Sequence, residues 1–180
     1  IHEVAKSDID SFMKQHDFLG INVTIPYKET VIPYLDEISA QAASIKAVNT
    51  IVNINGKLIG HNTDYFGMLA LIKRNKLDVN NKKVLILGTG GTSKTAYAVL
   101  SDLGARQILK ASIIDEPGTI TYEEANTIHN DVDIIINTTP VGMYPKNDGQ
   151  IIDLDNFKNV IGVIDVVYNP LRTNLVLQAK

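Results

Sequence analysis

The pattern of hydrophobic and polar residues at the start of the chain predicts one short helix followed by a strand. Apolar residues recur at helical spacing within residues 4–18, and Gly20 ends that segment. The β-rich run over residues 21–25 comes next and meets Pro26, which cannot donate to a sheet ladder. The chain must therefore turn there, which leaves Lys28 near a strand end.

The stretch up to residue 77 predicts helices on either side of a hairpin. The predicted elements are a helix over residues 31–43 interrupted by Pro33, strands over 48–52 and 57–61 that turn at Asn55-Gly56, and a helix over 65–73. Thr63 or Asp64 is placed to act as the N-cap of the last helix. Capping is therefore one explanation for the presence of Asp64.

From residue 78 the pattern becomes typical of a parallel α/β domain. The polar residues 78–83 indicate a linker, and a strand over 84–87, a glycine-rich turn and a helix over 94–103 follow. Continuous apolar runs typical of buried parallel strands lie at residues 107–109, 133–136 and 161–166. We therefore predict an α/β protein with one domain over residues 1–77 and a doubly wound, Rossmann-like domain over residues 78–180.

One connection in the second domain is too short for this pattern. About four residues separate a strand that ends near Ile114 from the β-like residues 119–121, whereas a parallel crossover needs at least roughly 10–12. Either the crossover helix is absent or the sequence has lost residues there. We favour lost residues, because residues 116–118 cannot make the crossover.

Composition excludes several classes of function. The 180 residues are 44% hydrophobic, enough for one sizeable core or two small ones, and the formal net charge of −3 argues against a nucleic-acid partner. The chain has no cysteine, and its four histidines lack metal-ligand spacing, so we expect no metal. No apolar run approaches the roughly 20 residues that span a bilayer, and no signal peptide is recognisable. We expect a cytoplasmic monomer or homodimer that binds a small molecule and no membrane.

Two polar segments suggest proton transfer. Lys28 follows the run Asn22-Val23-Thr24, and Asp64 closes the run Asn62-Thr63-Asp64. A lysine ammonium can stabilise the charge that develops on a carbonyl oxygen and can protonate it, and a carboxylate can orient the amine. We predict a Lys28–Asp64 dyad without assigning the proton to either member. Taken alone, Lys28 would be a solvated lysine, and the asparagines and Thr24 would be hydrogen-bonding residues of turns and strand ends.

The glycine-rich turn is a moderate signal for dinucleotide binding. Gly88-Thr89-Gly90-Gly91 follows a buried strand and precedes a helix, but it departs from the strict Gly-x-Gly-x-x-Gly spacing and by itself could be a tight connection. Glycines let the backbone approach a pyrophosphate, and free N–H groups at a helix start attract its charge. The polar residues Thr138 and Thr139 follow another buried strand, where ligands bind in such folds.

These motifs together resemble the shikimate dehydrogenase family, which includes the quinate/shikimate dehydrogenases. The resemblance covers most of the chain and rests on six ordered segments: residues 20–28, 47–50, 60–67, 88–91, 137–143 and 165–170. It implies NADPH-dependent reduction of 3-dehydroshikimate to shikimate, on the way to chorismate and the aromatic amino acids. It also implies an N-terminal substrate domain, an NADP-binding domain and an active site in the cleft between them.

The resemblance also implies roles for particular residues. Lys28 and Asp64 match the catalytic pair of the family. The residues expected to bind substrate are Thr24, Asn49, Asn62 and Tyr168. The residues expected to bind cofactor are Gly88, Gly90, Gly91, Thr92, Ser93, Thr138, Thr139 and Val166.

Three departures from the family pattern make the chain look incomplete. A strand with a serine-containing loop is expected before Ile1, and a helical segment with a glutamine is expected after Lys180. Residues 111–113 also lack the arginine of the family's 2′-phosphate clamp. Asp115 instead lies roughly 20 residues past the glycines, where an acid would favour NAD. We predict NADP with NAD as the alternative. The competing functions are a quinate/shikimate dehydrogenase using either cofactor and a non-catalytic dinucleotide-binding module.

Overall fold

The computed structural model describes residues 3–24, 26–114 and 116–180. The chain forms two compact units, residues 1–67 and 68–180, and helix α3 (Thr63–Arg74) runs from one into the other. The predicted domain boundary at residues 77 and 78 stays a prediction. Parts of the sequence interpretation fall on Ile25 and Asp115, which lie outside the described residues.

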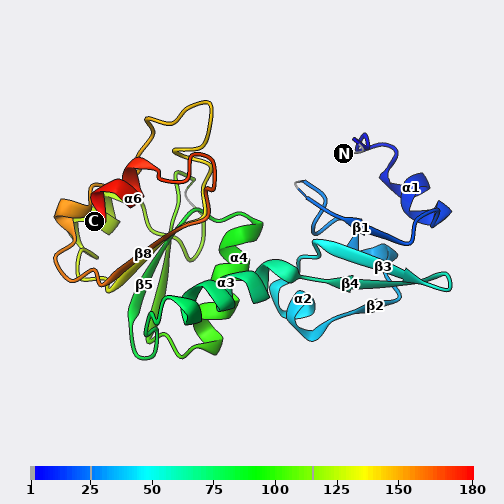
Figure 1. Ribbon diagram of the computed structural model, residues 1–180, viewed down its shortest axis with the longest axis horizontal. Helices are drawn as coiled ribbons and strands as arrows, with labels where there is room; N and C mark the ends of the chain where they lie inside the picture. The colour runs from blue at the N-terminus through cyan, green and yellow to red at the C-terminus, as the bar shows by residue number, and fades with distance from the viewer. Residues whose placement is uncertain (1–2, 25, 115) are drawn as a thin grey trace. The chain divides into compact units, whose positions relative to one another are not determined.

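The first unit is built on a mixed four-stranded sheet with the strand order β1-β3-β4-β2 (Figure 1). Its strands are β1 (Gly20–Asn22), β2 (Glu37–Ile38), β3 (Thr50–Ile54) and β4 (Lys57–His61). The predicted hairpin is confirmed: β3 and β4 pair antiparallel, and Asn55 and Gly56 take positive φ angles of 53° and 86° at the turn. Apolar side chains from α1 (Ile9–Gln15) and the sheet form the core, which includes Met13, Ile51 and Leu58.

The single helix predicted over residues 31–43 is wrong. The chain forms a short 3-10 helix, η1 (Ile32–Tyr34), then β2, then α2 (Ala40–Ile45). The Asp36 and Ser39 N–H groups donate to the carbonyls of Leu58 and Gly60, so pairing with β4 outweighs the helical spacing. The helix predicted over residues 4–18 is shorter than expected, because it ends where His16 takes a left-handed conformation. The predicted strand is shorter too, since β1 ends at Asn22.

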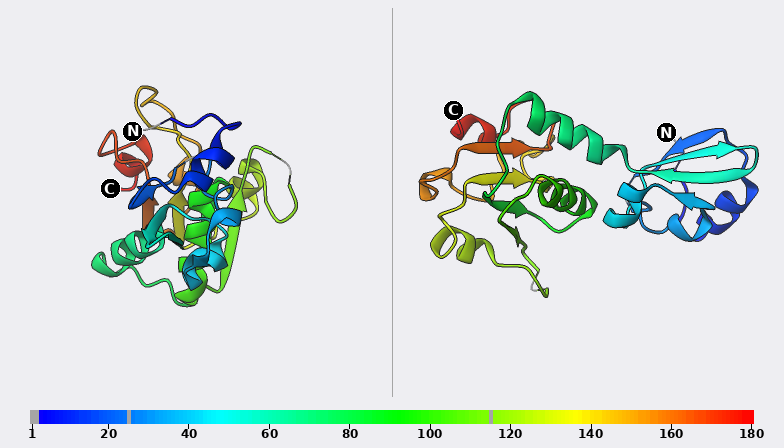
Figure 2. Two further views of the ribbon diagram at one scale, coloured as in Figure 1. Left: turned by 90° about the vertical axis from the view of Figure 1, so that its right-hand side faces the viewer. Right: turned by 90° about the horizontal axis from the view of Figure 1, so that it is seen from below.

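The second unit contains a parallel sheet with the order β6-β5-β7-β8. Its strands are β5 (Lys83–Leu87), β6 (Gln107–Ala111), β7 (Ile134–Asn137) and β8 (Gly162–Asp165), and its remaining helices are α4 (Gly91–Asp102), α5 (Tyr122–Thr127), η2 (Leu154–Asn156) and α6 (Asn174–Gln178). From β5 the chain winds to β6 and then crosses back to β7, which confirms the doubly wound arrangement (Figure 2). The reversal places the carboxyl ends of β5 and β7 side by side, where such folds bind ligands.

The segment after β6 differs from the expectation. The strand predicted to end near Ile114 ends at Ala111, and Ile120 forms only an isolated parallel bridge with that residue. Residues 112–119 alone connect the two bridge partners, and the described part of this connection contains no helix. The crossover to β7 is completed by α5, which starts in a capping box between Thr121 and Glu124. Loss of residues there stays a prediction.

Candidate functional site

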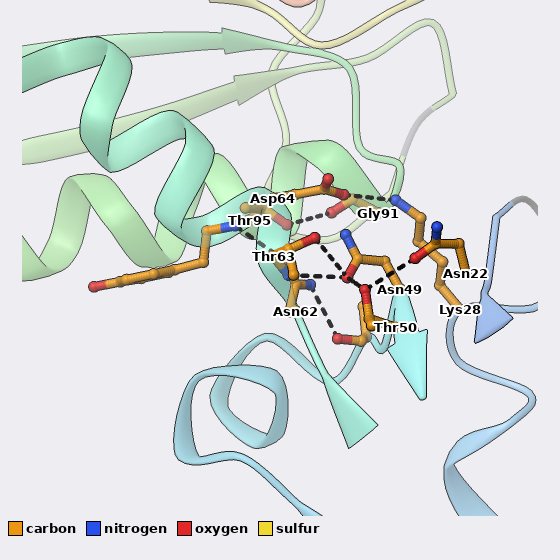
Figure 3. A network of polar contacts seen from close by, with 11 residues as sticks. Asn22, Lys28, Asn49, Thr50, Asn62, Thr63, Asp64, Gly91 and Thr95 are labelled. Carbon is orange, nitrogen blue, oxygen red and sulfur yellow. Dashed lines mark hydrogen bonds and ion pairs between the residues drawn. The ribbon is translucent and has the colours of Figure 1, made fainter. Parts of the chain in front are cut away.

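The structure brings Lys28 and Asp64 into contact within the first unit. The Nζ atom of Lys28 lies 2.7 Å from Oδ2 of Asp64, although the two residues are 36 positions apart in the chain (Figure 3). Lys28 lies in the turns after β1, and its carbonyl accepts a hydrogen bond of 2.7 Å from the Val48 N–H. The lysine side chain is 19% exposed and the aspartate 41%, so the pair is anchored by the fold yet open to a ligand.

The residue that caps α3 is Asn62, so the predicted cap at Thr63 or Asp64 is wrong. Helix α3 begins at Thr63, and Oδ1 of Asn62 accepts a hydrogen bond of 3.2 Å from the Tyr65 N–H. Its Nδ2 donates to the Ala47 carbonyl at 3.0 Å. Asp64 is therefore free of the capping role and occupies the first turn, where its charge is favourable. The predicted role of Asn62 in holding substrate stays a prediction, since its side chain is 1% exposed.

Asn49 anchors a polar network that leads to the dyad (Figure 3). Its Oδ1 accepts from the Thr63 N–H at 2.9 Å, from the Thr63 hydroxyl at 3.2 Å and from the Thr50 hydroxyl at 3.1 Å. Thr50 Oγ1 also lies 3.4 Å from Oδ1 of Asn22. Among the described residues, no group accepts a hydrogen bond from Nδ2 of Asn49. That amide N–H group is therefore available to a ligand next to the dyad.

Sequence reasoning missed the contributions of Asn22, Thr50 and Thr63 to this network. Thr50 and Thr63 adjoin predicted site residues in the sequence, and Asn22 lies close to Thr24. Only the pairing of β1 with β3 and of β3 with β4 shows that the three residues meet. Thr24, predicted to bind substrate, is exposed, and its carbonyl accepts from the Tyr27 N–H just before Lys28. Asn22 and Thr24 also line a groove of about 610 Å³.

In the second unit, the glycine-rich turn has the geometry of a backbone that approaches a ligand. Gly88 has a φ angle of 98°, and a Cβ atom there would lie 2.8 Å from Cγ2 of Thr139. At Gly90 a Cβ atom would meet no atom within 4 Å. The first of these glycines is therefore required by the fold, whereas the second leaves open space at the start of α4.

The first turn of α4 presents backbone N–H donors that no described residue accepts. Its first intrahelical bond runs from the Lys94 N–H to the Gly90 carbonyl, so the preceding N–H groups of Gly91, Thr92 and Ser93 lack intrahelical partners. The Ser93 side chain is 1% exposed, and its Oγ has no hydrogen-bond partner among the described residues. Donors of this kind, at the positive end of a helix, fit an anionic group such as a pyrophosphate.

The predicted cofactor residues after β7 and β8 hydrogen-bond within the protein. The Thr138 hydroxyl donates to the Leu87 carbonyl at 2.6 Å, and the Thr139 hydroxyl donates to Oδ1 of Asn137 at 2.7 Å. The Val166 N–H donates to the Asn137 carbonyl at 3.1 Å. Their predicted contacts with a cofactor stay predictions, and the residues form the edge of the sheet next to the glycine-rich turn.

The region after β6 offers no positive charge. Ser112 Oγ accepts from the Ile114 N–H at 3.0 Å, which closes a turn directly after the strand. The only charged residues in the sequence from 112 to 121 are Asp115 and Glu116, both acidic. The glycine-rich turn and α4 fit a dinucleotide pyrophosphate, whereas the segment after β6 supplies no cation for a 2′-phosphate.

Tyr168, the predicted substrate tyrosine, lies on the loop after β8 and is 81% exposed.

Comparison with known proteins gives consistent matches. Residues 2–51 match the family model of the shikimate dehydrogenase substrate binding domain. Shikimate dehydrogenase (NADP(+)) of Clostridium beijerinckii is 38% identical over the whole chain, which covers 70% of that relative. The alignment has 192 positions, so the relative has residues within the matched region that this chain lacks.

The helices of the described residues are each too short or too polar to span a lipid bilayer.

Solved structures agree over nearly the whole chain. Shikimate dehydrogenase 1 of Peptoclostridium difficile superposes with a TM-score of 0.85 at 38% identity, over 99% of this chain and 69% of the other. The shikimate dehydrogenase of Thermus thermophilus, solved in complex with NADP(H) and shikimate, gives a TM-score of 0.83 at 25% identity, over 98% of this chain and 69% of the other. Both matched structures therefore extend beyond the region shared with this chain.

Proposed function

This chain belongs to the shikimate dehydrogenase family, and we propose that it carries the catalytic pair for the reversible, NADPH-dependent reduction of 3-dehydroshikimate to shikimate. This step leads to chorismate and the aromatic amino acids. The observation that carries the proposal is the 2.7 Å contact between Lys28 and Asp64, two residues that the sequence separates widely. The similar Thermus thermophilus enzyme, solved with NADP(H) and shikimate, supports the choice of substrate and cofactor.

Lys28 and Asp64 supply the proton chemistry. When bound, the nicotinamide supplies the hydride that a ketone needs, and negative charge then develops on the carbonyl oxygen. The Lys28 ammonium stabilises that charge by a hydrogen bond and exchanges a proton with the oxygen. Asp64 holds Nζ in position by its own hydrogen bond, so the two side chains act as one unit. In the oxidation direction the same unit accepts the proton of the substrate hydroxyl.

The neighbouring polar groups hold the substrate ring. We assign the free amide N–H group of Asn49 and the exposed hydroxyl of Thr24 to substrate oxygens, and Tyr168 remains a predicted substrate-binding residue. Shikimate carries several hydroxyls, and a site built from fixed donors and acceptors rejects analogues that lack them. Asn62 contributes by fixing the start of α3, which carries Asp64.

The glycine-rich turn and the start of α4 hold the cofactor. Gly88, Gly90 and Gly91 bring the backbone to the pyrophosphate, and Thr92 and Ser93 add N–H and hydroxyl donors. Thr138, Thr139 and Val166, at the edge formed by β7 and β8, complete the cofactor contacts. The acidic segment after β6 favours a second candidate, a quinate/shikimate dehydrogenase that also accepts NAD. We further propose that the protein is cytoplasmic and acts as a monomer or homodimer.

The test is a matrix of two substrates and two cofactors. The full-length gene product is assayed for oxidation of shikimate and of quinate with NADP and with NAD, and reduced nicotinamide is followed by absorbance. The proposal predicts the highest kcat/KM with shikimate and NADP. Comparable values for quinate or NAD would favour the second candidate. Cofactor binding without turnover of any pair would indicate a non-catalytic dinucleotide-binding module.

A further inference from the structure

The loop that carries Tyr168 is closed by one carboxylate. Asp165 ends β8, and its Oδ1 accepts from the Val167 N–H at 2.9 Å. Its Oδ2 accepts from the Thr173 hydroxyl at 2.6 Å. Thr173 in turn caps α6 by accepting from the Val176 N–H, and it is 2% exposed. Both ends of the segment 166–173 are therefore tied to the side chain of Asp165.

The same carboxylate reaches the neighbouring strand. Asn137 pairs with Asp165 in the parallel register of β7 and β8, and its Nδ2 donates to Oδ1 of Asp165 at 3.0 Å. Oδ1 of Asn137 accepts from both the N–H and the hydroxyl of Thr139, at 3.0 and 2.7 Å. Asn137 is 2% exposed, so its amide has no water to replace these partners.

A further bond joins the two loops at a distance from Asp165. The Tyr144 N–H, on the chain after β7, donates to the Asn169 carbonyl at 2.9 Å. Residues 138–144 and 166–173 are thus linked both at their base and near Tyr168. The bond between Tyr144 and Asn169 joins two backbone groups. The links at the base, in contrast, depend on the Asp165 side chain, which accepts three hydrogen bonds at once.

We propose that Asp165 is a positioning residue. Its carboxylate holds the loop of Tyr168 against the carboxyl ends of β7 and β8, the edge of the sheet next to the glycine-rich turn. It touches neither reactant and acts through Val167, Thr173 and Asn137. An asparagine in its place could still accept from Val167 and Asn137, but its Nδ2 would face the Thr173 hydroxyl and remove the acceptor there. The role of Tyr168 in binding substrate rests on the proposed function, whereas the loop geometry does not.

The first test measures the loop without using activity. Hydrogen–deuterium exchange of the full-length protein is compared among wild type, Asp165→Asn, Asp165→Ala, Thr173→Val and Thr173→Ser. Peptides covering residues 166–173 should exchange about tenfold faster or more in the first three variants, since a hydrogen bond to a charged group is lost. Thr173→Ser keeps the hydroxyl and should match wild type. Asp148→Asn makes the same chemical change at an exposed aspartate of the same unit and serves as the control.

The second test separates positioning from general stability. In Asp165→Asn the KM for shikimate should rise about tenfold, while the KM for NADP should stay within about twofold, because Thr138 is also held by the bond to Leu87. Thr173→Ser, which keeps the hydroxyl, should have the wild-type KM for both. Unchanged exchange in residues 166–173, or an equal rise of both KM values, would overturn the proposal. An inactive wild type would refute the proposed function instead and leave the exchange result to decide. If Asp165→Ala does not fold, the other variants carry the test.

Discussion

Replacing Asn62 by alanine should destabilise the protein more than the loss of an ordinary helix cap. Loss of the N-cap bond to the Tyr65 N–H costs about 0.5–2 kcal/mol. The substitution also removes the Asn62 Nδ2 donor from the Ala47 carbonyl, and Ala47 is only 1% exposed. An unsatisfied buried acceptor costs about 1–3 kcal/mol. The two effects add to roughly 1.5–5 kcal/mol, and most of this range is large for a single substitution.

The assay is urea unfolding at pH 7 followed by far-ultraviolet circular dichroism, with Ser39→Ala as the matched control. Ser39 caps α2 by accepting from the Ala42 N–H at 3.3 Å, and its side chain makes no second bond to any described residue, so its loss should cost about 1 kcal/mol. Asn62→Asp keeps the cap acceptor but places an oxygen against the Ala47 carbonyl, so its free energy of unfolding should remain well below that of wild type. If Asn62→Ala were no more destabilising than Ser39→Ala, the second bond would contribute nothing and the reasoning would be refuted.

Four further predictions concern the dyad, the glycine-rich turn and an ion pair beside the parallel sheet. In activity assays, Asp64→Asn should lower turnover by roughly 100-fold or more. In urea titrations it should lower the free energy of unfolding by less than about 1 kcal/mol, because Asn62 caps α3. Gly88→Ala should cost about 1–3 kcal/mol through backbone strain. Gly90 has a φ angle of −70°, and a Cβ atom there would meet open space, so Gly90→Ala should keep the wild-type free energy of unfolding. By calorimetry, this variant should bind NADP roughly tenfold more weakly, a loss of about 1.4 kcal/mol. A hydrogen bond from Lys83 lowers the pKa of Asp131, so this carboxylate stabilises the fold above about pH 4. The stability difference between wild type and Asp131→Asn should therefore be present at pH 7 and shrink as the pH falls below that value; a constant difference would contradict it.

The second unit could be predicted well from the sequence because its two central strands, β5 and β7, are buried along their whole length. Continuous apolar runs such as the one at residues 133–136 are distinctive, and each predicted strand lies within a few residues of its observed position. The hairpin was equally predictable, since Asn55 and Gly56 tolerate the positive φ angles that its turn requires. Local chemistry fixed both features.

The segment around β2 could not be predicted because tertiary pairing decides it. Residues 37–38 pair with β4, which lies about 20 residues away in the chain, and helical spacing carries no information about that partner. The same limit applies to the site. Lys28 and Asp64 could be proposed as a pair from their motifs, but the engagement of Asn62 with Ala47 and the three bonds of Asp165 depend on which backbone groups the fold brings near them.

The central claim is that Lys28 and Asp64 together carry out the proton transfer, and the turnover of Lys28→Ala tests it most directly. Lys14→Ala is the control, since Lys14 forms an exposed ion pair with Asp10 at 2.8 Å in the same unit. Lys28→Ala should reduce shikimate turnover by about 10²–10⁴-fold with a change in unfolding free energy below about 1 kcal/mol, and NADP should still bind. Lys14→Ala should leave turnover unchanged. Turnover of Lys28→Ala within about twofold of wild type would contradict the claim, since the lost general acid–base contribution should be far larger.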